Sequence, residues 1–255
     1  MTLTSGFRWI CILPLALMVW GLQGCSSLAP SQKSVTTASS TAWQPEDQMK
    51  WDAVKIPGKV ATQYSVVRVS NRSALQANAQ SSASMLRKDL HIEPAQLGVL
   101  SFSWQIKKLI DGADMAQRDH DDSPVRLVLA FDGDRSQFSA KNAMLSELSH
   151  VMTGRPMPYA TLMYVWCNHR PVESVIQNPR TDRIQKIVVE SGAQGLNQWL
   201  TYERNVREDY EKAFGEPPGA LIGIGLMTDS DNTRSHAQAW YGPIQLMDFK
   251  GKPSL

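Results

Sequence analysis

Apolar and polar residues alternate along much of the chain beyond about residue 60. Residues 100–106 alternate in this way, as expected of a β-strand with one buried face. Residues 125–131 do the same and place Arg126, Val128 and Ala130 on the face opposite the other apolar positions. Further strand-like segments are 64–69, 73–79, 159–166, 184–189, 221–227 and 239–249. Many short strands separated by Gly, Pro, Asn and Asp predict a mainly-β fold, a jelly-roll-like β-sandwich.

Two segments have apolar residues at helical spacing instead. Residues 142–152 form one, with Gly154 just beyond its end. Residues 199–214 form the other, which Gly215 and two prolines terminate. We expect two short helices on the sandwich, with their apolar stripes packed in the core.

The first 24 residues have the pattern of an export signal. A short polar start with one positive charge precedes the apolar run 9–21, which is too short to span a bilayer of about 30 Å comfortably. Leu22-Gln23-Gly24-Cys25 then resembles the bacterial lipobox. This pattern predicts cleavage before Cys25 and acylation of its thiol, palmitate included; an ordinary cleaved signal or an uncleaved anchor is the alternative. Each buried CH₂ contributes about 0.8 kcal/mol, so several acyl chains would hold the protein on a membrane.

The residues after the lipobox suggest where the chain goes and how it is divided. Ser26 in second position, by analogy with the enterobacterial sorting rule, favours the periplasmic face of the outer membrane. The Ser-, Thr- and Ala-rich stretch that follows reads as a tether. We therefore expect a signal peptide at 1–24, the acylated cysteine and tether at 25–42, and a β-sandwich domain at 43–255.

Charge and cysteine content exclude two classes of protein. The chain has 255 residues and a formal net charge of +2, with scattered Lys and Arg, so nucleic acid is not an expected partner. Its three cysteines are Cys11, Cys25 and Cys167, which leaves one in the body and no internal disulfide to form. Cys167 follows an apolar run, so we expect a small buried hydrophobic residue.

Several short motifs recur in one family of bacterial proteins. They are Phe102-Ser103-Trp104, Asp121-Asp122-Ser123-Pro124-Val125-Arg126, Tyr164-Val165-Trp166, Arg204-Asn205-Val206, Phe214-Gly215-Glu216-Pro217-Pro218, Met227-Thr228-Asp229-Ser230-Asp231-Asn232-Thr233 and Ala239-Trp240-Tyr241-Gly242. The set resembles the uncharacterised family known as domain of unknown function 3047, over about residues 60–247. The resemblance implies a shared domain but no activity, cofactor or site residue.

Two of these motifs are rich in aspartate. Asp229, Asp231 and Asn232 follow an apolar strand, and oxygen side chains at this spacing could ligate Ca²⁺. The alternatives are local Asx-turn bonding to nearby backbone N–H groups, which is the simpler reading, and direct contact with a bound ligand.

The other acidic motif precedes the strand that carries Arg126. Asp121 and Asp122 could do acid–base work if burial separated their pKa values. The simpler alternative is an Asp122–Arg126 ion pair at the start of that strand.

Aromatic residues give a third group of candidates. Trp240 and Tyr241 are adjacent, so on a strand one faces inward and the other outward. An exposed ring could stack on a sugar, whereas most tryptophans in a domain of this size belong to the core.

Motifs of common enzyme classes are absent from the sequence. It has no Gly-x-Ser-x-Gly elbow, phosphate-binding Gly-x-x-x-x-Gly-Lys loop or His-Glu-x-x-His helix. We therefore lean away from an enzyme. The leading hypothesis is a lipid-anchored envelope protein whose sandwich binds a ligand, a glycan being the favoured one, with no cofactor except Ca²⁺ in the case above. The alternatives are a polysaccharide hydrolase or lyase using Asp122, Asp229 or Asp231, and a structural protein that docks an envelope partner.

Overall fold

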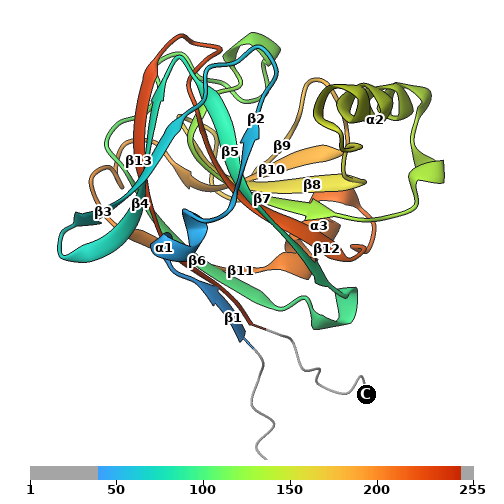
Figure 1. Cartoon of the computed structure of the whole chain (residues 1–255), viewed down its shortest axis with the longest axis horizontal. Helices are drawn as coiled ribbons and strands as arrows, with labels where there is room; N and C mark the ends of the chain where they lie inside the picture. Colours follow the sequence, from blue (N-terminus) through green and yellow to red (C-terminus); the bar gives the residue numbers. More distant parts are fainter. Residues whose placement is uncertain (1–39, 248–255) are drawn as a thin grey trace, which may run out of the picture. The chain divides into compact units, whose positions relative to one another are not determined.

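The structure is a computed structural model, and it describes residues 40–247. Two β-sheets face each other and three α-helices lie around them (Figure 1). This confirms the mainly-β, jelly-roll-like sandwich expected from the alternation. The predicted signal peptide, the lipobox with Cys25 and the C-terminal residues 248–255 lie outside the described residues.

The first sheet has six strands. They are β1 (Ser40–Trp43), β3 (Gln63–Val69), β4 (Arg72–Gln80), β6 (Val99–Ile106), β11 (Leu200–Asn205) and β13 (His236–Met247). Their order is β11-β6-β13-β4-β3, and β1 pairs with the end of β13. β1 includes the last three residues of the predicted tether, so strand structure begins before residue 43.

The second sheet has seven strands. They are β2 (Asp52–Lys55), β5 (Ala83–Ile92), β7 (Ser123–Phe131), β8 (Ala160–Cys167), β9 (Val175–Gln177), β10 (Ile184–Ser191) and β12 (Leu221–Asp229). Their order is β2-β5-β12-β7-β8-β10-β9. Neighbours are antiparallel except β8 and β10, which run parallel.

The core lies between the two sheets and is rich in aromatic rings. Phe102 on β6 stacks on Tyr164 of β8, with ring centroids 5.4 Å apart, and so joins the two sheets. Cys167 is 1% exposed, which confirms the buried thiol. Because every second residue of a strand points inward, the same alternation leaves Arg126, Val128 and Ala130 of β7 on the outer face of the seven-stranded sheet.

The helices are α1 (Pro45–Gln48), α2 (Ala140–Thr153) and α3 (Val206–Phe214), and short 3₁₀ turns occur at Pro94–Gln96, Arg118–His120 and Arg135–Gln137. α2 begins after Ser139, whose hydroxyl accepts a hydrogen bond from the Asn142 N–H, and ends at Gly154 with φ of 74°. Within the described residues no helix is long and apolar enough to cross a membrane.

The expected helix over 199–214 is wrong in its first half. Residues 200–205 form β11 and pair with β6, and helix α3 begins only at Val206, after the Asn205 cap. The side chains of Leu200 and Tyr202 are spaced two apart and pack against the core. The apolar spacing in this segment fits both a helix and a strand. Pairing with the edge of β6 selects the strand, and the periodicity of the sequence does not reveal that edge.

The expectation that the apolar stripe of α2 lies in the core is also wrong. The helix buries its polar residues Asn142 and Ser146 and exposes four of its five large apolar ones, Leu145 being half-buried. Asn142 donates to Asp182 Oδ1 at 2.7 Å and accepts from the Thr181 hydroxyl at 2.7 Å, so hydrogen bonds rather than apolar contacts fix the orientation of the helix.

Candidate functional site

A cleft crosses the outer face of the seven-stranded sheet. It consists of three adjoining cavities of about 510, 210 and 160 Å³. The middle cavity shares Arg87 and Pro158 with the largest one, and Met163 and Met227 with the smallest. The shared walls make one groove with an apolar centre between two charged ends.

The apolar centre is lined by methionine, small residues and aliphatic residues. These are Met85, Val128, Ala130, Met157, Pro158, Thr161, Met163, Ile184, Gly223, Ile224, Gly225 and Met227, with Arg87 at the boundary. Two glycines of β12 leave room for the side chains of β5. A Cβ at Gly225 would lie 2.7 Å from Met85 Sδ, and one at Gly223 would lie 3.1 Å from Arg87 Nε. Met85 and Arg87 therefore lie across β12.

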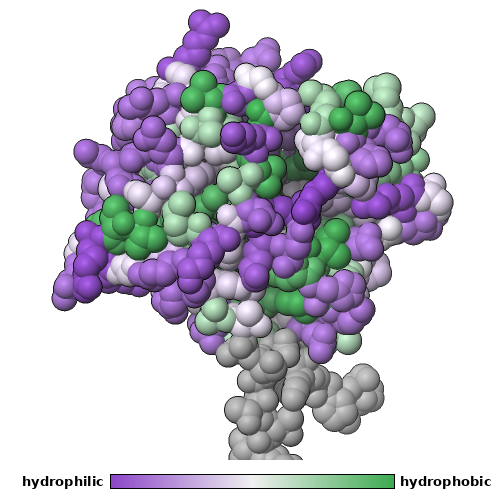
Figure 2. Space-filling model, viewed as in Figure 1, coloured by the Kyte–Doolittle hydropathy of each residue, from purple (hydrophilic) through white to green (hydrophobic). Residues whose placement is uncertain are grey.

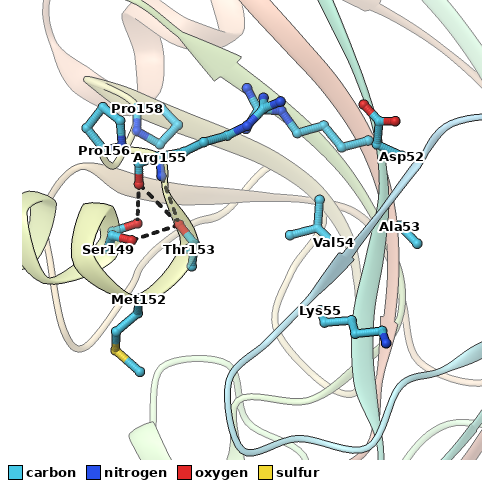
Figure 3. Close-up of a pocket in the computed structure, with 11 residues that line it drawn as sticks. Asp52, Ala53, Val54, Lys55, Ser149, Met152, Thr153, Arg155, Pro156 and Pro158 are labelled. Carbon is cyan, nitrogen blue, oxygen red and sulfur yellow. Dashed lines mark hydrogen bonds between the residues drawn. The ribbon is translucent and has the colours of Figure 1, made fainter.

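The widest end of the cleft lies between α2 and β2. In Figure 3 Ser149, Met152 and Thr153 of α2 form one wall, and Asp52 to Lys55 of β2 form the other. Arg155 Nη1 meets Asp89 Oδ2 at 2.6 Å, and Arg87 Nη2 meets Asp89 Oδ1 at 2.9 Å.

One donor at this end has no hydrogen-bond partner. Arg87 Nε is buried and unpaired among the described residues. A buried N–H without an acceptor costs free energy, so an acceptor from a ligand at this boundary would be favoured.

The narrow end is built around Arg126, which is 3% exposed. Its Nε donates to Asp229 Oδ1 at 3.0 Å, and its Nη2 donates to Asp229 Oδ2 at 2.9 Å. Nη2 also donates to the backbone and side-chain oxygens of Asp121 at 2.8 and 3.0 Å. Nη1 contacts only Met163 Sδ, at 4.0 Å, among the described residues. That amino group therefore has no oxygen acceptor among the described residues, and Arg126 lines the smallest cavity.

A second buried cation neutralises Asp121. Lys186 of β10 is fully buried, and its Nζ donates to Asp121 Oδ1 and Oδ2 at 2.9 and 2.8 Å and to the Met115 carbonyl at 2.9 Å. The buried group thus holds two carboxylates and two cations, with no net formal charge. The pairing of opposite charges offsets the free-energy cost of removing these groups from water.

Burial and neighbouring charges shift the pKa values of this group. Burial raises the pKa of Asp229 to about 6, against the opposing pull of Arg126. Burial raises that of Asp121 too, but Arg126 and Lys186 outweigh it and hold the pKa below its ordinary value. Burial and Arg126 lower the pKa of Lys186 to about 8. All three groups are therefore mainly ionised at neutral pH.

Asp122 organises the loop after β12 and does not pair with Arg126. Its carboxylate accepts from the Thr233 N–H at 2.7 Å, the Thr233 hydroxyl at 2.6 Å and the Asn232 N–H at 3.2 Å. The expected Asp122–Arg126 ion pair is wrong because Asp229 and Asp121 occupy the guanidinium instead. Local Asx-turn bonding is also wrong for Asp229, whose partners are Arg126 and the Ser123 N–H on another strand.

Three carboxylates from the two aspartate-rich motifs lie close enough together to be considered as ligands of one metal ion. Oxygens of Asp122, Asp229 and Asp231 lie within 4.8 Å of one another. Asp229 is paired with Arg126, Asp231 with Lys59, and Asp122 with the loop N–H groups. Ca²⁺ needs six to eight coordinating oxygens, and the oxygens of these carboxylates are already bound to other groups. The three carboxylates therefore suit Arg126 and Lys59 better than Ca²⁺.

Neither of the two aromatic candidates lines the cleft. Tyr241 is 1% exposed and its hydroxyl donates to the Met227 carbonyl at 2.7 Å, so it cannot serve as a sugar platform. Trp240 is half-buried on the outer face of the six-stranded sheet, between Gln76 of β4 and Gln105 of β6. Trp104 and Trp166 are buried in the core. The site thus joins Asp121, Asp122, Arg126, Asp229, Asp231 and Asn232 and leaves Trp240 and Tyr241 out.

Sequence reasoning missed Lys186, Lys59 and the methionines of the floor. Lys186 was visible as a lone charge within the apolar segment 184–189, where a buried cation needs an anionic partner. Lys59 and Met163 carried no such signal, because only the folding of distant segments brings them to the cleft.

Comparisons with solved structures give weak likenesses. They include a xylan-binding module, CBM86, from Roseburia intestinalis (11% identity, 82% of this chain and 96% of that one, TM-score 0.31). Others are endoglucanase 3, family GH12, of Trichoderma harzianum (8%, 83% and 97%, TM-score 0.38) and winged bean acidic lectin (8%, 82% and 99%, TM-score 0.35). Likenesses this low carry no argument about what the present chain binds.

Comparison by sequence is more decisive. No curated protein matches the chain. A family model described as "Protein of unknown function (DUF3047)" matches residues 49–245, a span that contains both aspartate-rich motifs and every residue of the cleft. The chain belongs to this family, domain of unknown function 3047.

Proposed function

We propose that this protein binds an amphipathic ligand in the cleft, with an aliphatic segment on the methionine floor and a polar group at Arg126. The observation that carries the proposal is the composition of the groove. Its centre is apolar, its ends are charged, and none of the described residues that line its three cavities is aromatic.

The floor favours a flexible aliphatic chain over a sugar ring. Sugars are commonly held on aromatic faces, which the cleft lacks among its described residues. Methionine side chains are unbranched and polarizable, so they adapt to apolar partners of varied shape. Met85, Met157, Met163 and Met227 are all partly exposed, and covering them would remove apolar surface from water.

The narrow end suits a polar head group. Arg126 Nη1 is available as a donor, and Lys59, Asp231 and Asn232 line the same cavity. The ion-paired charges here cancel, and Arg180, which is exposed, adds a positive charge to the same cavity. A head group that offers an acceptor, neutral or anionic, is therefore favoured.

Titration of the chain 37–255, whose described residues 40–247 belong to one compact unit, with the fluorescent fatty acid cis-parinaric acid tests the proposal. We expect saturable binding that Met227→Lys weakens at least about tenfold, because an ammonium group would lie on the apolar floor. Val66→Lys, on an exposed position of β3, is the matched control and should bind like the wild type. Absence of saturable binding, or equal loss in both variants, would remove the proposal.

We also propose that Cys25 carries the acyl chains and holds the domain at the periplasmic face of the outer membrane. The lipobox residues 22–25 and Ser26 support this location. Expression in bacteria fed alkyne-palmitate should label the wild type and not Cys25→Ser. Label in both, or in neither, would contradict acylation at this residue.

A glycan remains a second candidate, at a different place. Trp240 is half-buried between Gln76 and Gln105, and an indole face beside amide side chains is a surface on which a sugar could stack. A glycan array probed with the wild type and Trp240→Ala decides this, since only binding lost in the variant supports the site.

A further inference from the structure

The apolar stripe of α2 is exposed where a surface helix would normally bury it. Met144, Leu148, Val151 and Met152 are 65, 52, 83 and 55% exposed, and their spacing of four, three and one residues places them on one face. The opposite face, with Asn142 and Ser146, is the buried one. Figure 2 shows the resulting apolar surface over α2. Contiguous exposed apolar surface of this kind marks an interaction site.

The stripe is continuous with the wide end of the cleft. Met152 belongs to the stripe and also lines the largest cavity, beside Thr153 and Ser149 of the same helix (Figure 3). The opening of the groove therefore lies directly beside an apolar helix face.

We propose that this stripe docks on the lipid surface of the membrane, so that an aliphatic chain can pass between the bilayer and the cleft. This inference rests on the proposed function of the cleft and of Cys25. An interfacial helix lies in the membrane plane with its apolar face buried about 5–10 Å, which matches a single exposed stripe on a helix that is otherwise anchored to the domain. Lys141 lies exposed in the first turn of α2, where its cation can reach a lipid phosphate, whereas Arg155, beyond the end of the helix, is paired with Asp89.

The chain between the acylated cysteine and the sandwich is long enough for this contact. β1 and α2 lie at opposite ends of the domain (Figure 1). A domain of this size has a radius of gyration of about 17 Å, hence a diameter of roughly 45 Å. Fourteen residues lie between Cys25 and Ser40, and the fifteen Cα–Cα steps of this segment span at most about 50 Å. An acyl anchor at Cys25 therefore permits α2 to face the bilayer.

The test uses the full lipidated chain in phosphatidylethanolamine–phosphatidylglycerol vesicles. Val151→Cys carries an environment-sensitive NBD fluorophore, and vesicles with doxyl-labelled lipid quench it if it enters the bilayer. Cys167 is buried and does not compete for the label. We expect quenching at position 151 and none at Val172→Cys, an exposed apolar position outside α2.

A second variant separates docking from labelling effects. Met144→Ser with Leu148→Ser should reduce the quenched population at position 151 at least about tenfold. These exposed positions should leave the unfolding midpoint unchanged. Absence of quenching overturns the inference, as does concentration-dependent shielding of NBD without quenching, which would indicate a second copy of the chain on the stripe.

Three measurements show separately whether the lipid anchor, the cleft or the α2 contact fails. Flotation of the chain with vesicles reports the anchor, and displacement of cis-parinaric acid reports the cleft. Floating protein with a functional cleft but no quenching would remove the role of α2 alone.

Discussion

Removal of Arg126 is the perturbation that the structure describes most sharply. Arg126→Met keeps a long side chain but deletes the cation that pairs with Asp229 and Asp121. Asp121 retains Lys186 as a partner, whereas Asp229 is left without a cation. The variant therefore isolates one buried carboxylate.

The size of the effect follows from that isolation. Breaking a buried ion pair by removing one partner costs about 3–5 kcal/mol in the free energy of unfolding, because an uncompensated charge remains. The cost depends on pH. The pKa of Asp229 is already raised to about 6 by burial, and loss of Arg126 raises it further. A carboxyl whose pKa is higher in the folded than in the unfolded chain stabilises the fold at low pH. This contribution is lost as the pH rises through the pKa of the folded state. The destabilisation is therefore larger at pH 8 than at pH 5.

Urea unfolding followed by tryptophan fluorescence at both pH values measures this difference. Arg155→Met is the matched control, since its ion pair with Asp89 is exposed and such pairs are worth about 1 kcal/mol at most. Adding Asp229→Asn to Arg126→Met should restore part of the stability at pH 8, because it deletes the isolated charge. The reasoning would be refuted if Arg126→Met lost no more free energy of unfolding than the control, and lost the same amount at both pH values.

Three further outcomes are expected. The pKa of Lys186 is lowered to about 8, so the unfolded chain binds more protons than the folded one near and above that pH. The free energy of unfolding should therefore rise between pH 8 and 10 by about 2 kcal/mol more in the wild type than in Lys186→Met, and equal slopes would contradict the shift. Asp122→Ala should release the loop at Asn232 and Thr233, seen as faster amide hydrogen exchange there and not at Ala239 of β13. Calcium at millimolar concentration should leave the melting temperature equal to that in EDTA, because Arg126 and Lys59 already pair with the carboxylates; a rise of several degrees would restore the Ca²⁺ hypothesis.

Alternation along single strands predicted much of the fold, and the reasons for its failures are physical. The segment 125–131 was assigned correctly because both faces follow the two-residue period. β5 was missed because the outward-facing residues Met85, Arg87 and Asp89 are one apolar and two charged, so no regular alternation is visible. Met85 and Arg87 lie over the glycines of β12, and Asp89 pairs with Arg87. The orientation of α2 was missed because hydrogen bonds of Asn142 outweigh its apolar stripe.

The sequence singled out part of the candidate site and none of its pairing. Arg126 and both aspartate-rich motifs were singled out, and the structure brings them together. Which carboxylate meets Arg126 depends on the register between β7 and β12, which places Arg126 opposite Met227 and Ser123 opposite Asp229. That register comes from the packing of two segments a hundred residues apart, so no local pattern contains it.

The central claim is that the methionine floor receives an aliphatic ligand. Its most direct test is a ¹³C-methyl methionine NMR titration of the domain 37–255 with sodium laurate below its micellar concentration. We predict saturable shifts of the Met85, Met163 and Met227 methyl signals, with Met247, which lies on β13 of the other sheet and lines none of the three cavities, unchanged. Unmoved signals for all three floor methionines, with laurate in excess, would contradict the account.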